Sequence, residues 1–230
     1  MNLRILIACL SYFYLLIGSS LPCYADITMT IRHLYHSKRH PLSGIQTSTI
    51  YVSGSKYRVD HPLMSIICDP GARRLIYIER QKHIYFNDDI NIYFDLMQED
   101  AQSQKREGYE VSDTNKTTML LNHRCRHYVV TDRSGLTRGD LLVAMDVAMP
   151  DTMNPYNVAV DGFNMKIDVA RRITLLPLAI ISVTTDGNYF DQYEATSVST
   201  APIKSNVFDI PAGYKETHDM FDITGTKHRE

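Results

Sequence analysis

The sequence contains no tryptophan, although it has 15 tyrosines and 7 phenylalanines. Tyr51, Tyr77, Tyr85 and Tyr93 are candidates for a sugar- or peptide-binding surface, and the absence of tryptophan counts against a carbohydrate site. Tyrosine is also a favoured strand residue with an apolar body and a polar tip. We therefore expect these tyrosines to be structural.

The sequence also lacks a basic excess and internal repeats. Removal of Arg4 with an N-terminal leader leaves 23 Lys and Arg against 26 Asp and Glu, a net charge of −3. Nucleic-acid binding usually requires a basic face or stripe, so no nucleic-acid partner is predicted. Because nothing recurs at a fixed period, solenoids and propellers are not expected.

Long hydrophobic runs are confined to the N-terminus, where Arg4 precedes an uncharged segment over residues 5–18. This segment is shorter than the ~20 apolar residues of a membrane-spanning helix. Residues 1–25 are predicted to be a signal peptide cut between Ala25 and Asp26. Cleavage at Cys23 as a lipoprotein is disfavoured by Pro22. We expect a periplasmic protein without a transmembrane anchor, with one domain over residues 26–216 and a polar tail over 217–230.

Cysteine is scarce, and Cys68 and Cys125 are the two that remain after cleavage. In an oxidising compartment two cysteines are more often paired than not, so a Cys68–Cys125 disulfide is predicted. The alternative is two buried thiols that act as small hydrophobic residues.

The sequence has no complete catalytic motif, and no nucleophile signature lies near its histidines. His123, Cys125 and His127 share one face of a predicted strand and have side chains that bind zinc or copper. Neighbours on one strand face lie about 7 Å apart, however, and a disulfide at Cys125 would exclude a thiolate ligand. We predict no metal, no cofactor and no enzymatic activity.

The dominant pattern is a period of two. Ile27, Met29 and Ile31 alternate with polar residues, and Tyr57 and Val59 alternate with Lys56, Arg58 and Asp60. This pattern indicates strands with one apolar face and one polar face. Further strands are predicted at 48–52, 64–68, 75–78, 83–86, 117–121, 126–131, 140–148, 178–184, 189–199 and 207–210.

Two segments have helical spacing, residues 90–101 and, less regularly, 157–172. The predicted fold is mainly β with an α+β character: a curved antiparallel sheet that forms a half-barrel over one or two helices. Its inner face would carry Ile27, Met29, Ile31, Tyr57 and Val59.

The C-terminal stretch VFDIPAGYKE (207–216), preceded by YEATSVSTAPIKSN and by LPL at 176–178, resembles the end of a family of exported bacterial proteins of unknown function. That family is similar to the LolA/LolB lipoprotein-carrier superfamily. LLNHRCRHYVV (120–130) also resembles a turn and cysteine-containing strand of the family. The resemblance implies a LolA-like half-barrel with an apolar concave surface, which shelters acyl chains in the carriers.

Two functions remain open. One is a non-catalytic binding protein that shelters a lipid, an acylated protein or another apolar ligand against Ile27, Met29, Ile31, Tyr57 and Val59. The other is a structural or regulatory envelope protein that contacts a protein partner and fills its interior with its own side chains. A metal protein or enzyme that uses His123, Cys125 and His127 is the least favoured.

Overall fold

The computed structural model describes residues 26–37, 43–91, 110–131, 137–148, 175–184 and 189–224. The predicted signal peptide lies outside these residues. So do the predicted helix at 157–172 and, apart from Ile90 and Asn91, the one at 90–101.

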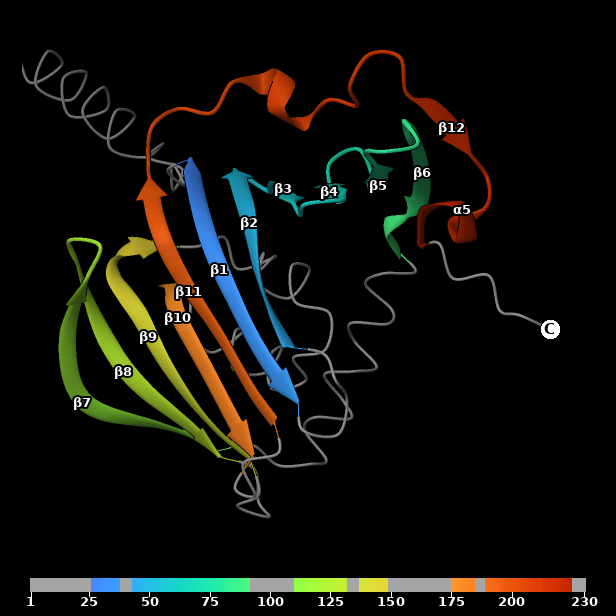
Figure 1. Cartoon of the computed structure of the whole chain (residues 1–230). Helices are drawn as coiled ribbons and strands as arrows, with labels where there is room; N and C mark the ends of the chain where they lie inside the picture. Colours follow the sequence, from blue (N-terminus) through green and yellow to red (C-terminus); the bar gives the residue numbers. More distant parts are fainter. Residues whose placement is uncertain are drawn as a thin grey trace, which may run out of the picture.

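The described residues form one large, open, curved sheet with the order β12-β6-β5-β4-β3-β2-β1-β11-β10-β9-β8-β7 (Figure 1). All neighbours are antiparallel except β12 and β6, which are parallel. The fold is thus mainly β, as predicted. The strands are β1 (Ile27–Ser37), β2 (Ser43–Ser53), β3 (Lys56–Asp60), β4 (Met64–Asp69), β5 (Arg74–Glu79), β6 (Ile84–Asp89), β7 (Glu110–Leu120), β8 (His123–Thr131), β9 (Thr137–Ala148), β10 (Leu175–Thr184), β11 (Tyr189–Ser199) and β12 (Lys215–Thr217).

Tight turns and short polar connections explain much of this order. Gly54 has φ 57° in the turn between β2 and β3, a conformation that glycine adopts without a Cβ penalty. The β7–β8 turn places Leu121 and Asn122 at φ 52° and 67°. Two central residues with positive φ are typical of a two-residue hairpin turn whose twist matches that of the strands.

The period-two pattern predicted most strands, but not all of them. The predicted strand at 207–210 is wrong, because Ser205–Phe208 forms a 3-10 helix. The polar first half of β7 and the short β12 were not predicted. Pro177 lies within β10, where the pairing with β9 shifts register on both sides of it.

After β11, in the middle of the sheet, the chain runs past the ends of β2 to β5 to reach the outer side of β6 (Figure 1). There β12 pairs with β6, and the short helix α5 (Met220–Thr224) follows with Ile223 buried. The chain expected to be a polar tail from residue 217 therefore contributes to the fold as far as Thr224. We call residues 204–224 the C-terminal strap.

Candidate ligand-binding face

The five predicted ligand-binding residues lie on one face of β1 and β3, and four of them form two apolar rows across neighbouring strands. The fifth, Ile31, lies opposite the buried Ser48 of β2. One row passes from Met29 through Ile50 of β2 to Val59. The other passes from Ile27 through Val52 to Tyr57 and ends on Cys68 of β4. Directly opposed residues on adjacent strands have Cβ atoms about 4.5 to 5.5 Å apart, so each row is a continuous apolar band.

These side chains belong to the main hydrophobic core. Ile27, Met29, Ile31, Tyr57 and Val59 are each 0 to 1% exposed. They share a cluster with residues of β4, β5 and β8 to β11, which links both arms of the curved sheet. In this conformation they pack against protein, so a ligand can contact them only after they are uncovered.

Cys68 and Cys125 are not joined by a disulfide, which corrects the predicted pairing. Both are buried thiols, as the alternative reading held. No strand pairing joins the two thiols. Cys68 on β4 lies between Tyr57 and Leu75, and Cys125 on β8 lies between Thr118 and Ala144.

Burial keeps both thiols protonated at neutral pH. It raises the pKa of Cys68 to about 12, an effect that a hydrogen bond with Tyr57 partly offsets and the Asp69 charge increases. Burial likewise raises the pKa of Cys125. A thiol of raised pKa is a weak nucleophile and a poor metal ligand, because both roles need the thiolate.

The three candidate metal ligands, His123, Cys125 and His127, make other contacts in the structure. His123 Nδ1 lies 2.9 Å from Asp146 Oδ2, and His127 Nε2 lies 2.8 Å from Asp140 Oδ1. Both partners are on β9, and Cys125 between the histidines is buried against its β9 neighbour Ala144. Within the described residues no group of three potential ligands is placed to hold a metal ion.

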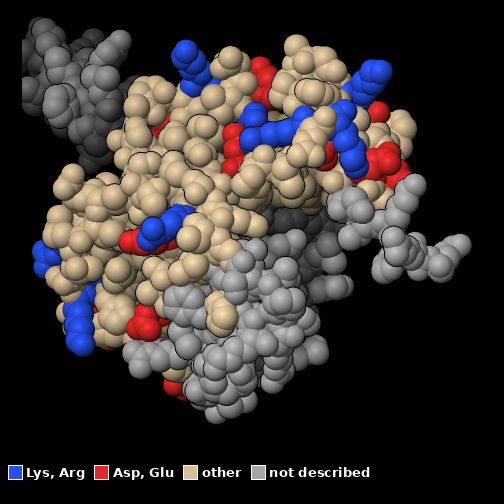
Figure 2. Space-filling model, viewed as in Figure 1, with Lys and Arg blue, Asp and Glu red and all other residues tan. Residues whose placement is uncertain are grey.

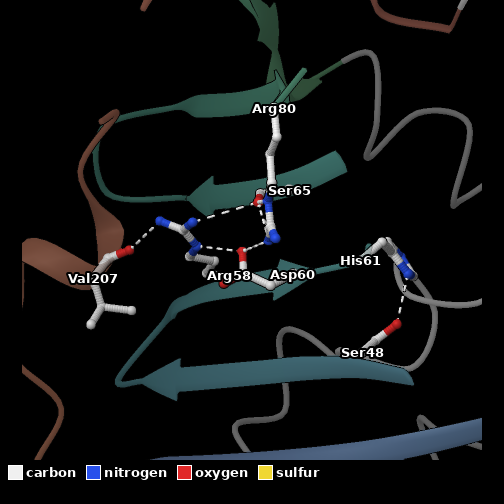
Figure 3. Close-up of polar contacts among 7 residues, drawn as sticks. All are labelled: Ser48, Arg58, Asp60, His61, Ser65, Arg80 and Val207. Atoms are coloured by element: carbon white, nitrogen blue, oxygen red, sulfur yellow. Dashed lines mark hydrogen bonds and ion pairs between the residues drawn. The ribbon is translucent and has the colours of Figure 1, made fainter. Parts of the chain in front are cut away.

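On the opposite face of β3, a polar network that the sequence did not reveal surrounds Arg58 (Figure 3). Arg58 donates from Nε to Asp60 Oδ1 at 2.7 Å and from Nη1 to the Val207 carbonyl of the C-terminal strap at 2.8 Å. Arg80 Nη2 lies 3.0 Å from the same Asp60 oxygen and also donates to Ser65 Oγ at 2.8 Å. The network therefore joins β3 and β4 to the strap.

Apolar contacts complete the attachment of the strap. Ile67, Ile76 and Ile78, on the outer face of β4 and β5, form a second cluster that packs against Tyr85 and against Phe208, Ile210 and Tyr214 of the strap. Three residues of the VFDIPAGY stretch, Phe208, Ile210 and Tyr214, thus pack on the outer face. In the sequence, the polar network around Arg58 was indicated only by the alternation in β3, which placed Arg58 and Asp60 on the polar face.

No protein-family model matches the sequence, and no curated protein matches it significantly. Among solved structures, an uncharacterized conserved protein from Thermus thermophilus aligns with 91% of this chain and 99% of its own, at 6% identity and a TM-score of 0.50. This likeness concerns the fold alone. PNGF-II aligns with 86% or less of this chain at a TM-score of 0.42 or below, and this chain spans only about a third of its length.

Other solved structures align with lower TM-scores. MucB aligns with 88% of this chain and 63% of its own at 13% identity and a TM-score of 0.44. A putative outer membrane lipoprotein-sorting protein domain from Vibrio parahaemolyticus aligns with 80% of this chain and 89% of its own at 6% identity and a TM-score of 0.28. The described part of the chain has no helix long and apolar enough to cross a membrane.

Proposed function

We propose that this chain is a non-catalytic binding protein of the bacterial envelope that shelters an acyl chain or another apolar ligand against its concave sheet face. The observation that carries the proposal is the pair of apolar rows from β1 to β4, in which the aliphatic Ile27, Ile50, Val52 and Val59 lie beside Met29, Tyr57 and Cys68. An acyl chain gains about 0.8 kcal/mol for each CH₂ that it buries, so such a face holds a lipid in water.

In this proposal Ile27, Met29, Ile31, Tyr57 and Val59 contact the ligand, and the structure represents the closed state. Export by cleavage after Ala25 would deliver the protein to the periplasm. The donor or acceptor of the ligand would be a lipid surface or an acylated protein.

A second candidate function is contact with an envelope protein partner, with the interior filled by the protein itself. The observation in its favour is the complete burial of the five candidate residues. In that case the concave face serves folding, and recognition takes place elsewhere on the surface.

Native mass spectrometry of the protein purified gently from the envelope distinguishes the two functions. A mass excess that organic solvent extracts as lipid supports the sheltering function. A mass that equals the chain alone, and stays unchanged after incubation with lauric acid and with lysophospholipid, contradicts it and favours the partner function. The N-terminus of the same sample tests cleavage at Ala25.

A further inference from the structure

The sheet has two very different ends. At one end β12 has three residues, whereas at the other end β7 runs for eleven, from Glu110 to Leu120. Among the described residues β7 pairs only with β8, so its outer edge presents backbone N–H and C=O groups to solvent (Figure 1). A long unpaired edge is a template for an added strand, and proteins usually block such edges.

A bulge divides this edge. The register with β8 shifts between Asp113 and Thr117, and Asn115 has φ 57°. The Asn115 N–H donates to Asp113 Oδ1 at 2.8 Å, and the Lys116 N–H donates to Thr114 Oγ1 at 3.3 Å. These donors are used locally, so the bulge divides the edge into two regular segments, Glu110–Asp113 and Thr117–Leu120. The second segment is the one that lies beside exposed apolar and basic side chains.

This segment is also accessible. Every side chain from Asn115 to Met119 is exposed, and Met119 has 63% of its surface in solvent. Met119 lies opposite Arg124 on β8. Continuing the β8–β9 register by one residue beyond Cys125 and Ala144 sets the exposed Met145 beside Arg124. The edge strand thus carries one exposed methionine, Met119, and Met145 lies two strands further into the sheet. Methionine side chains adapt to varied apolar partners.

The charges next to the edge are basic. Lys116 and Arg124 are exposed, and within the described residues neither is in an ion pair. The nearby Asp113 is already paired with Arg126 at 3.0 Å, and Asp146 is paired with His123. Basic side chains are visible in Figure 2 at the β7 side of the molecule. This arrangement favours an acidic partner segment.

A second copy of this chain fits the edge less well. Antiparallel pairing of two Thr117–Leu120 segments about a two-fold axis would gather Lys116 and Arg124 of both copies at one interface. Like charges brought together in this way oppose association.

We propose that the Thr117–Leu120 edge of β7 binds an extended segment of a protein partner that carries acidic and apolar residues on the same strand face, as an added antiparallel or parallel strand. The backbone groups of β7 provide the pairing, Met119 contacts the apolar residues, and Lys116 and Arg124 attract the acidic ones. This site is independent of the concave face, so it holds whether or not an apolar ligand binds there.

The probe for this test is a labelled acetylated peptide of repeated Glu-Glu-Val-Val, which sets both glutamate and valine on each face of the strand, compared with a Lys-Lys-Val-Val repeat of the same length. Fluorescence anisotropy measures affinity, and amide hydrogen exchange locates the contact. We expect the acidic peptide to bind about tenfold more tightly, which corresponds to 1.4 kcal/mol. It should slow exchange at Thr117–Leu120, and N-methylation of its valines should abolish binding.

Surface variants complete the test without risk to the fold. K116E/R124E should reverse the charge preference, and Met119→Ser should weaken binding of the acidic peptide. Lys204→Glu, an exposed lysine on the C-terminal strap, is the matched control and should change neither. Equal affinity for both peptides, or protection that maps elsewhere, would overturn the proposal. So would protection at β7 that depends on protein concentration alone, which would assign the edge to a second copy.

Discussion

Neighbouring residues in β3 have opposite roles. The Tyr57 side chain is almost fully buried in the concave face, whereas Arg58 lies on the outer face and holds the C-terminal strap. Alternation along the strand predicted this division from sequence, because period two assigns each residue to a face. The partners of Arg58 were not predictable, since Val207 is distant in sequence.

The contribution of Arg58 can be measured against an exposed arginine. Arg58→Met removes charge-assisted hydrogen bonds to Asp60 and to the Val207 carbonyl. We expect the free energy of unfolding to fall by about 2 to 3 kcal/mol. Arg32→Met breaks the exposed Arg32–Glu194 pair, which should cost less than about 1 kcal/mol. Urea unfolding of the two variants compares these costs, and equal losses would refute the structural role of Arg58.

The raised pKa of the Cys68 thiol makes the free energy of unfolding depend on pH. Its pKa is raised from 9.0 to about 12 in the folded protein, so above pH 9 the unfolded chain loses the thiol proton while the folded protein keeps it. The stabilisation is complete below pH 9 and is lost as pH rises through the folded pKa, by about 1.4 kcal/mol per unit.

Other groups in the protein also titrate in this pH range. The effect of Cys68 is therefore measured as a difference between the natural protein and a variant that lacks the thiol. The difference in unfolding free energy between the natural protein and Cys68→Ala should shrink between pH 9 and pH 10.5. A difference that stays constant over this range would show that Cys68 is not buried as described.

At the scale of elements, the amount that the sequence predicted depends on how each segment buries its side chains. Strands such as β3, with one buried face, carry a clear period-two pattern and were predicted with correct bounds. The first half of β7 is exposed and polar, so it carries no such pattern. The apolar residues of 207–210 mimic a strand, but they serve to cover the outer face of β4 and β5.

Two phenylalanines in the C-terminal strap test how it is attached. Phe208 is half-buried against the outer-face cluster, whereas Phe221 is 56% exposed. We expect Phe208→Ala to lower the free energy of unfolding by about 2 kcal/mol, less than for a fully buried phenylalanine. Phe221→Ala should change it by less than about 0.5 kcal/mol. If thermal and urea unfolding rank the two variants the other way, the strap is not held as described.

At the scale of the whole molecule, strand order governs what the sequence could not reveal. The predicted strands were each inferred from the pattern of residues within their own segment. The order of the strands does not follow from such patterns: β11 lies next to β1, which places β10 and β11 in the middle of the sheet. This order gives Cys68 and Cys125 different cross-strand neighbours, and both are free thiols rather than the predicted disulfide. The five candidate residues were correctly assigned to one face, yet their complete burial depends on the curvature of the entire sheet.

An intact mass under non-reducing conditions checks this consequence. The protein purified without reductant should have the mass of the chain with both thiols free, and it should take up two maleimide groups once unfolded. A mass two hydrogens lower, with no maleimide uptake in the unfolded state, would contradict the free state of both thiols.

Uptake of apolar ligands by the concave face can be measured through the accessibility of Cys68 to thiol reagents. In a Cys125→Ala background, the reaction rate with dodecyl maleimide is compared with that of a polar sulfonated maleimide. A C68A/C125A/T47C variant, with its cysteine on the exposed outer face of β2, provides the reference rates.

We expect that, relative to this reference, the dodecyl reagent reacts with Cys68 at least about tenfold faster than the polar one, a preference of 1.4 kcal/mol. Lauric acid should slow labelling of Cys68 and leave the outer-face cysteine unaffected. Equal relative rates for the two reagents, with no competition by lauric acid, would show that the concave face is only a folding core.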